Sequence, residues 1–221
     1  MLVSYTFSKA IDYGGEQLGG GDLLYRDVRN IRAERGLAAF DMRNRLAVSY
    51  LYELPFGQGK RFGISNPVLN AIGGGWQVNG ITTLRSGQPF TPSMGFSTAN
   101  TGNARPDRIA NGSLPRDRRT LASYFDKTAF AAAAPFNFGN AGRNILIGPG
   151  AVNFDFSAFK RAPIRQLGEG GEVQFRVEFF NLLNTPQFDI PNARVDIPQG
   201  ASITGLTTPM REIQLGLKVI F

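Results

Sequence analysis

The sequence contains no cysteine and no histidine. Without thiols the chain has no disulfide framework, and without thiolate or imidazole groups it lacks the usual ligands of zinc and haem sites. The absence of histidine also removes the commonest general base, and with it Ser-His-Asp and Cys-His catalysis. Carboxylate or lysine chemistry stays open, but no motif indicates it. We therefore predict a protein that is not an enzyme and has no catalytic, cofactor-binding or metal-binding residues.

Long apolar runs are also missing. No stretch reaches the roughly 18 consecutive apolar residues that a membrane-spanning helix needs. The longest run, near Ala129 to Phe136, is rich in alanine and is interrupted by Pro135. The first residues, Met1 to Phe7, have neither the charged region nor the long apolar region of a signal peptide, and they already alternate as a strand does. We therefore expect the chain to be the tail of a longer protein.

The charge balance is strongly basic, with a net charge of +7 and a sequence pI near 10. Such a balance suggests an anionic partner such as nucleic acid or lipid head groups. The basic residues nevertheless alternate with acidic ones, as in the segments 26–29 and 116–119. A nucleic-acid footprint usually clusters its lysines and arginines on one face. The pattern therefore favours arginines scattered over loops and predicts no nucleic-acid partner.

Six segments alternate apolar and polar residues with a period of two, which indicates strands with two different faces. They span residues 1–9, 43–54, 75–86, 151–160, 171–181 and 210–221. The fifth segment also fits an amphipathic helix, because Phe175, Phe179 and Leu183 stand four residues apart. Its β-branched and aromatic content favours a strand.

Alternation alone fits a soluble sandwich as well as a membrane barrel, but three features favour the barrel. The segments have the length of about 9 to 11 residues that a tilted strand needs to cross a bilayer. Their polar faces carry charges in mid-strand, such as Arg176 and Lys218, and aromatic residues gather near the segment ends. Long gaps alternate with short ones, as extracellular loops alternate with periplasmic turns. The sequence therefore predicts an all-β fold, an antiparallel transmembrane β-barrel segment of about six long strands with long extracellular loops.

The long loop between residues 86 and 151 holds two arginine-rich stretches. Their guanidinium groups are candidates for contacting an anionic ligand or lipopolysaccharide phosphates, since arginine forms paired bonds to phosphate. The alternative is that they are solvated loop charges that pair with acidic neighbours. The candidate ligand-contacting residues are Arg105, Arg108, Arg116, Arg118 and Arg119.

Two other loop features favour no ligand. Asp12, Glu16, Asp22 and Asp27 follow no established calcium-loop spacing, so we interpret them as solvated loop acids. The glycine run 19–21 is followed by no Gly-Lys-Ser/Thr sequence, so it is not a phosphate-binding loop.

Short strings along the chain add a further observation. They are SYTFSKA at 4–10, DMRNRL at 41–46, YELPFG at 52–57, GWQVNGI at 75–81, RSGQPF at 85–90, YFDKTAF at 124–130, GNAGRN at 139–144, FRVEFFNLLN at 175–184 and the ending from Arg211 to Phe221. Each string is loose, but together they cover nearly the whole chain. In this order they resemble the C-terminal barrel region of TonB-dependent outer-membrane receptors, of the Oar-like type that contains a carboxypeptidase regulatory domain.

The resemblance implies a barrel of about 22 strands around an N-terminal plug, importing a scarce nutrient with energy relayed by TonB. It implies the outer membrane of a Gram-negative cell as the location, with outer-membrane lipids and lipopolysaccharide as partners. Phe221 resembles the terminal signal that the outer-membrane assembly machinery reads. The chain departs from the family in having no plug domain and no TonB box. Either the chain is a fragment of a longer protein, or several copies close one barrel. We favour a fragment that meets TonB only through a missing plug and that is completed by the rest of the barrel.

Six strands leave two unpaired edges, which is costly in lipid, so such a partial receptor is not expected to transport alone. The main alternative is an outer-membrane surface binding protein or adhesin that binds glycan or another polymer through loops 9–44 and 86–151. A hydrolase of the outer-membrane phospholipase type is a third possibility, but it normally needs a histidine to activate its serine.

Overall fold

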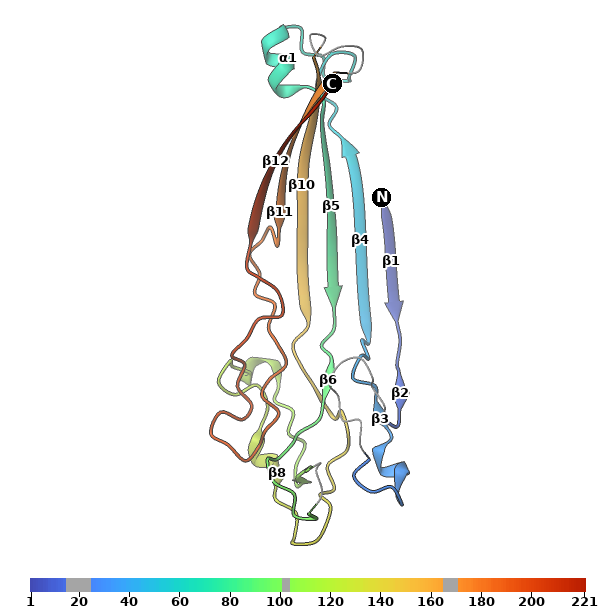
Figure 1. Cartoon of the computed structure of the whole chain (residues 1–221), viewed down its shortest axis with the longest axis vertical. Coiled ribbons are helices and arrows are strands. Elements are labelled where there is room, and N and C mark those ends of the chain that lie inside the picture. Colours follow the sequence, from blue (N-terminus) through green and yellow to red (C-terminus); the bar gives the residue numbers. More distant parts are fainter. Residues whose placement is uncertain (15–24, 101–103, 165–170) are drawn as a thin grey trace.

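The computed structural model describes residues 1–14, 25–100, 104–164 and 171–221. Its main feature is a six-stranded antiparallel sheet in the order β1-β4-β5-β10-β11-β12, so each long strand pairs with the next one along the chain (Figure 1). The strands are β1 (Leu2–Phe7), β4 (Asn44–Glu53), β5 (Trp76–Arg85), β10 (Ala151–Pro163), β11 (Glu172–Phe180) and β12 (Glu212–Ile220). The predicted all-β fold with six antiparallel strands is confirmed.

The strand ends differ slightly from the predicted segments. β1 ends at Phe7, whereas β10 continues beyond Lys160 to Pro163. The extension follows from pairing, because the last residues of β10 lie opposite the first residues of β11, with Pro163 opposite Glu172. Alternation detects the change of faces along a strand, but it does not show how far the partner strand extends.

The register places side chains of one kind on each face of the sheet, because directly opposite residues on neighbouring strands share a face. One face is mainly polar. It carries Arg45, Ser49, Glu53, Gln77, Asn79, Thr83, Asn153, Asp155, Ser157, Gln174, Arg176, Glu178, Gln214 and Lys218. The other face is mainly apolar. It carries Val3, Tyr5, Leu46, Val48, Tyr50, Trp76, Val78, Phe154, Phe156, Val173, Phe175, Val177, Ile213, Leu215, Leu217 and Val219.

The long connections fold into a compact unit at one end of the sheet, which we call the loop cap (Figure 1). Its described residues are 8–14, 25–43, 86–100, 104–150 and 181–211. It contains the strand pairs β2 (Ile11–Asp12) with β3 (Gly36–Leu37), β6 (Pro89–Phe90) with β9 (Leu146–Ile147), and β7 (Asp107–Arg108) with β8 (Phe130–Ala131), and the 3-10 helices η1 (Ile31–Glu34), η2 (Arg116–Arg118) and η3 (Lys127–Ala129).

The loop cap has its own hydrophobic core. Phe125 is buried between Phe90 and Phe130, with ring centroids 5.6 Å and 6.2 Å away, and Leu146 and Ala201 complete the cluster. Because these residues come from two different connections, the core fastens the loops to one another. The sequence prediction treated these stretches as open loops and missed this core.

The opposite end of the sheet holds the short connections. The connection after β4 contains a helix, α1 (Pro67–Gly73), where the sequence indicated only turns. The glycine run 19–21 and the acids Glu16 and Asp22 lie outside the described residues. Among the residues that the structure describes, no helix is both long and apolar enough to cross a membrane.

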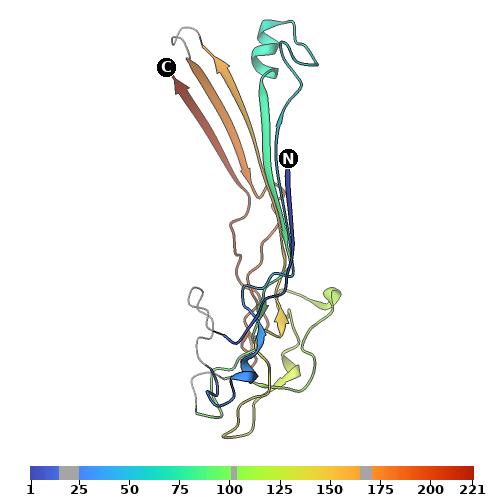
Figure 2. The same ribbon diagram turned by 90° about the vertical axis from the view of Figure 1, so that its right-hand side faces the viewer.

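The sheet is open. Over the described ranges, β1 and β12 each pair with a single neighbour, β4 and β11 respectively. Viewed from the side, the sheet is curved, and β11 and β12 lie apart from β4 at the end that holds α1, whereas β10 stays paired with β5 (Figure 2). The six strands therefore form a curved wall with two exposed edges rather than a closed barrel.

Candidate functional site

The polar face of the sheet forms a concave groove of about 650 Å³. Polar side chains from the four inner strands of the sheet, β4, β5, β10 and β11, line it. Those that lie on the polar face include Ser49, Asn79, Asp155, Ser157 and Glu178. Apolar side chains of the same face, Leu2, Leu51, Ile81 and Phe180, also line it, so the groove is mixed in polarity.

Asp155 is the best-fixed acid of this groove. One of its carboxylate oxygens accepts a hydrogen bond from the Asn153 amide at 2.9 Å, and the other accepts the backbone N–H of Asn181 at 2.9 Å. Next to it, the Ser157 hydroxyl donates to the amide oxygen of Asn79 on β5. These contacts fix the acid within the wall and join β10 to β5 and to the start of the loop cap.

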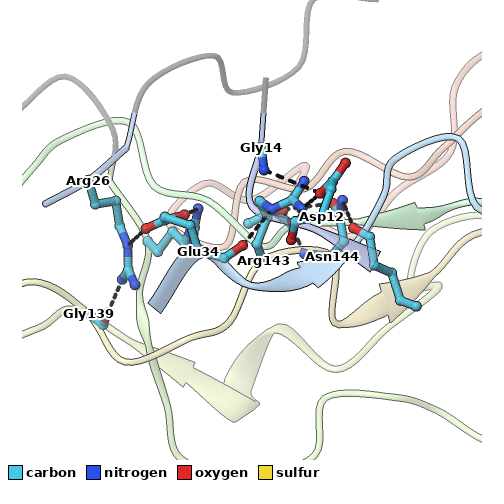
Figure 3. Close-up of polar contacts among 10 residues, drawn as sticks. Asp12, Gly14, Arg26, Glu34, Gly139, Arg143 and Asn144 are labelled. Carbon is cyan, nitrogen blue, oxygen red and sulfur yellow. Dashed lines mark hydrogen bonds and ion pairs between the residues drawn. The ribbon is translucent and has the colours of Figure 1, made fainter. Parts of the chain in front are cut away.

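A second polar site is buried inside the loop cap, around Glu34 (Figure 3). The Glu34 carboxylate pairs with Arg26, whose Nε lies 3.1 Å away, and with Arg105. All three side chains are almost completely buried. Because a buried carboxylate needs charged partners, this arrangement fixes the first connection against the connection between β5 and β10.

Arg143 extends the same network toward β2. Its guanidinium donates to the backbone oxygens of Glu34 at 3.0 Å and Asp12 at 3.1 Å, and it also pairs with the Asp12 carboxylate. Burial lowers the pKa of the Arg143 guanidinium. The next residue, Asn144, has a positive φ of 54° and donates from its amide to the Leu37 backbone oxygen at 2.6 Å. The polar groups of this network bond to one another, which indicates that the network holds the loop cap together.

Sequence reasoning missed both Glu34 and Arg143. Arg26 lies 8 residues from Glu34, but the other partners lie 71 to 131 residues away along the chain, so no local spacing marks the network. The GNAGRN string at 139–144 contains Arg143 and enters the sequence analysis only as part of the family resemblance.

The five candidate arginines occupy different surroundings. Arg105 is inside the Glu34 network with its side chain 2% exposed, so it does not face an external ligand in this structure. Arg108 donates to the backbone oxygens of its own loop at residues 110 and 111. Arg119 donates to the backbone oxygen of residue 114 and stacks 5.0 Å from the Tyr124 ring. Arg116 and Arg118 lie exposed in η2.

Among the residues described, no group of three or more acidic side chains is arranged to hold a metal ion. Asp12, one of the four loop acids weighed as calcium ligands, pairs with Arg143. Asp27 accepts the backbone N–H of Arg29 at 2.9 Å within its own turn.

Residues 1–214 match the family model of an outer membrane beta barrel domain. The chain belongs to this barrel family. No curated protein and no solved structure matches the chain. For this barrel domain, the apolar face of the sheet is the lipid-facing side and the polar groove is the lumen side.

The family also orients the wall in the outer membrane. Outer-membrane barrels have short periplasmic turns and longer extracellular loops. The loop cap therefore lies outside the cell, and α1 and the end of β12 lie at the periplasmic side. Phe221 follows β12 there with 94% of its surface exposed.

Proposed function

We propose that this barrel domain is part of a TonB-dependent receptor that takes up a scarce nutrient and does not transport alone. The feature that supports this most is the combination of a folded loop cap with a groove on the mainly polar face of the sheet. A cap with its own core offers a fixed extracellular surface for capturing a solute, and the hydrophilic lumen side accommodates a plug. The strings shared with the Oar-like receptors support the same proposal.

The partners follow from this proposal. The lipid-facing side meets outer-membrane lipids and lipopolysaccharide, and the strand edges meet the rest of the barrel. TonB is reached only through a plug, and Phe221 is the residue that the assembly machinery reads. The domain itself performs no chemistry and binds no nucleic acid.

Photo-cross-linking from the two faces of one strand tests the proposal. A photoreactive amino acid replaces Asn79 on the lumen side or Val78 on the lipid side of β5, in the full chain within its native outer membrane. We expect position 79 to cross-link to a polypeptide that carries a plug and a TonB box, and position 78 to cross-link to lipid. Cross-links to water or lipid alone from position 79 contradict a plugged receptor.

A second measurement tests the transport. Cells that express the chain are compared for nutrient-limited growth with and without a functional TonB. Growth that depends on the chain and stops without TonB is the expected outcome. Growth that depends on the chain but not on TonB overturns the energy coupling.

A surface binding protein for glycan or another polymer is the second candidate function, and Phe136 is the observation that favours it. This residue has a φ of 63°, which is rare for a bulky side chain, and its ring is 90% exposed on the loop cap. Its backbone N–H donates to the backbone oxygen of Thr98 at 2.7 Å. This hydrogen bond holds the turn that carries the ring against the loop segment around Thr98. Exposed aromatic rings are suited to stacking on sugar faces.

Replacing this ring tests the adhesin function. The F136A variant is compared with I109A, whose side chain is 68% exposed on the same connection. Binding of cells to a glycan array that is lost in F136A and kept in I109A supports the adhesin. Equal binding of both variants and the unchanged chain removes it.

A further inference from the structure

The helix α1 belongs to the connection from β4 to β5 and lies at the periplasmic end of the wall (Figure 1). Its exposed side chains are apolar. Val68, Leu69 and Ile72 are 66%, 60% and 67% exposed, and Ile72 shares a helical face with Leu69, three residues before it, and with Val68, four residues before it. Asn70 lies on the other side and accepts the backbone N–H of Gln58 at 2.8 Å. The helix therefore packs on the turn through Asn70 and turns its apolar side away from the protein.

Two side chains show on which side of the wall the helix ends. Trp76 Nε1 donates to the Ile72 backbone oxygen at 2.8 Å, and Lys160 Nζ donates to the backbone oxygens of Ala71 and Ile72. Trp76 and Lys160 lie opposite each other on β5 and β10, on the apolar face of the sheet. The C-terminal end of α1 is therefore on the lipid-facing side of the wall.

Both ends of the helix have their polar groups satisfied. At the first turn, the Asn66 side chain accepts the N–H groups of Val68 and Leu69 at 2.9 Å and 3.2 Å. At the last turn, Trp76 and Lys160 occupy two of the carbonyls that a helix leaves unpaired. The first turn has no acidic residue and the last turn no basic one. Such a helix can leave water at little cost, because few polar groups lose a partner.

We propose that α1 is an interfacial anchor that inserts Val68, Leu69 and Ile72 into the phospholipid leaflet on the periplasmic side of the outer membrane. The lipid-facing strand surface leads directly to the helix, and Trp76 sits between them where an indole prefers the head-group level. The Lys160 ammonium, 5.8 Å from the Trp76 ring, lies at the same level with its positive charge toward lipid phosphates. An amphipathic helix in this position lies in the plane of the interface with its apolar side in the acyl-chain border.

The anchor rests on the outer-membrane placement and not on the transport function. The absence of cysteine lets each single-cysteine variant carry one label. The full chain is reconstituted in vesicles of phosphatidylethanolamine and phosphatidylglycerol, with an environment-sensitive fluorophore on L69C of α1, I109C of the loop cap or L215C of the lipid-facing side of β12. Emission wavelength and quenching by nitroxide-labelled lipid are then measured.

We expect the label on L69C to show blue-shifted emission and quenching by a nitroxide near the head group. The label on L215C should be quenched by a nitroxide deep in the acyl chains, and the label on I109C should be quenched by neither. If L215C is quenched and L69C behaves as I109C does, the wall is in the membrane and the anchor is wrong. If neither L69C nor L215C is quenched, both the anchor and the membrane orientation of the wall are overturned.

The triple variant V68S/L69S/I72S gives an independent test that needs no label on the helix. It changes exposed side chains only, and the contacts of Asn66 and Asn70 stay. We expect tryptic cleavage after Arg61, an exposed residue of the same connection that both chains retain, to be slow in intact vesicles for the unchanged chain and fast for the triple variant, with cleavage in detergent equal for both. Equal cleavage of both chains in vesicles contradicts the anchor.

Discussion

Glu34 shows how one side chain can connect two distant loops. Its carboxylate pairs with Arg26 and Arg105, and its backbone oxygen accepts from Arg143. We predict that E34Q destabilises the loop cap by about 3–5 kcal/mol, because it leaves buried guanidinium groups without their counter-charge. Hydrogen exchange of the amides between residues 104 and 144 measures this loss.

The matched control is D117N, which removes an exposed carboxylate from η2 on the same connection. Its amide exchange should equal that of the unchanged chain. An E34Q variant with unchanged exchange would show that the ion network contributes nothing to the cap.

Asp196 provides a pH-dependent contact at the residue scale. The side chain of Arg194, bonded at 2.8 Å to each carboxylate oxygen, holds the pKa of Asp196 well below its ordinary value of 3.8, and the Gly95 N–H adds a bond at 3.1 Å. A lowered folded pKa means that the stabilisation is complete above the ordinary value and is lost as the pH falls through the folded pKa.

We therefore predict that the Gly95 amide stays protected from pH 7 down to about 4 and loses its protection only in stronger acid. Hydrogen exchange of this amide, corrected for its intrinsic pH dependence, gives the profile. The D196N variant should show weaker protection with no acid transition. The prediction fails if the unchanged chain loses protection near neutral pH.

At the scale of the strand, the two faces of β12 predict opposite responses to one substitution. Leu215 points to lipid and Gln214 to the lumen side. An arginine on the lipid-facing side near mid-strand costs about 2–4 kcal/mol, whereas lumen-side changes are tolerated. L215R should therefore reduce the urea-resistant membrane fraction strongly, and Q214R, which faces Glu178 across the strands, should leave it unchanged.

The two variants also test the register itself. A shift by one residue exchanges the faces of the strand. If Q214R were the damaging variant, the face assignment of β12 would be wrong.

The long strands could be predicted from sequence because alternation records the contrast between lipid and lumen along every strand. The loop cap could not be predicted, since its core joins Phe90, Phe125 and Leu146, which come together only after the chain has folded back on itself. The same reason hid Arg143 and Glu34. Helix α1 was missed because its seven residues are too few for a helical period to stand out between the flanking glycines.

The candidate ligand residues were predicted from residue type alone, and this explains their uneven outcome. Arginine runs indicate phosphate binding only if the guanidinium groups face solvent. The structure places Arg105 in the interior of the cap and leaves Arg108, Arg116, Arg118 and Arg119 exposed. For these four exposed residues the ligand role stays a prediction.

At the scale of the whole molecule, the open edges of the wall determine its stability in isolation. Over the described residues, β1 and β12 each have one paired side, whereas β5 and β10 are paired on both. We predict that in the purified full chain the amides of β1 and β12 exchange much faster than those of β5 and β10, because their outward backbone groups have no partner in the sheet.

The native outer membrane supplies the comparison for this prediction. There we expect the edge strands to become as protected as the central ones, because additional strands complete the barrel. Equally fast exchange of the edges in both settings would mean that the wall stays open in the membrane.

The buried network of the loop cap also sets an order of events in time. Arg143 binds backbone oxygens 109 and 131 residues away, so its bonds form only when three separate stretches have arrived on the same side of the membrane. A finished cap with its ions cannot cross hydrocarbon, where each buried charge and unpaired backbone group is costly. The stretches must therefore cross unfolded and join afterwards. We therefore expect the buried network of the cap to form only after its stretches have reached the outer side.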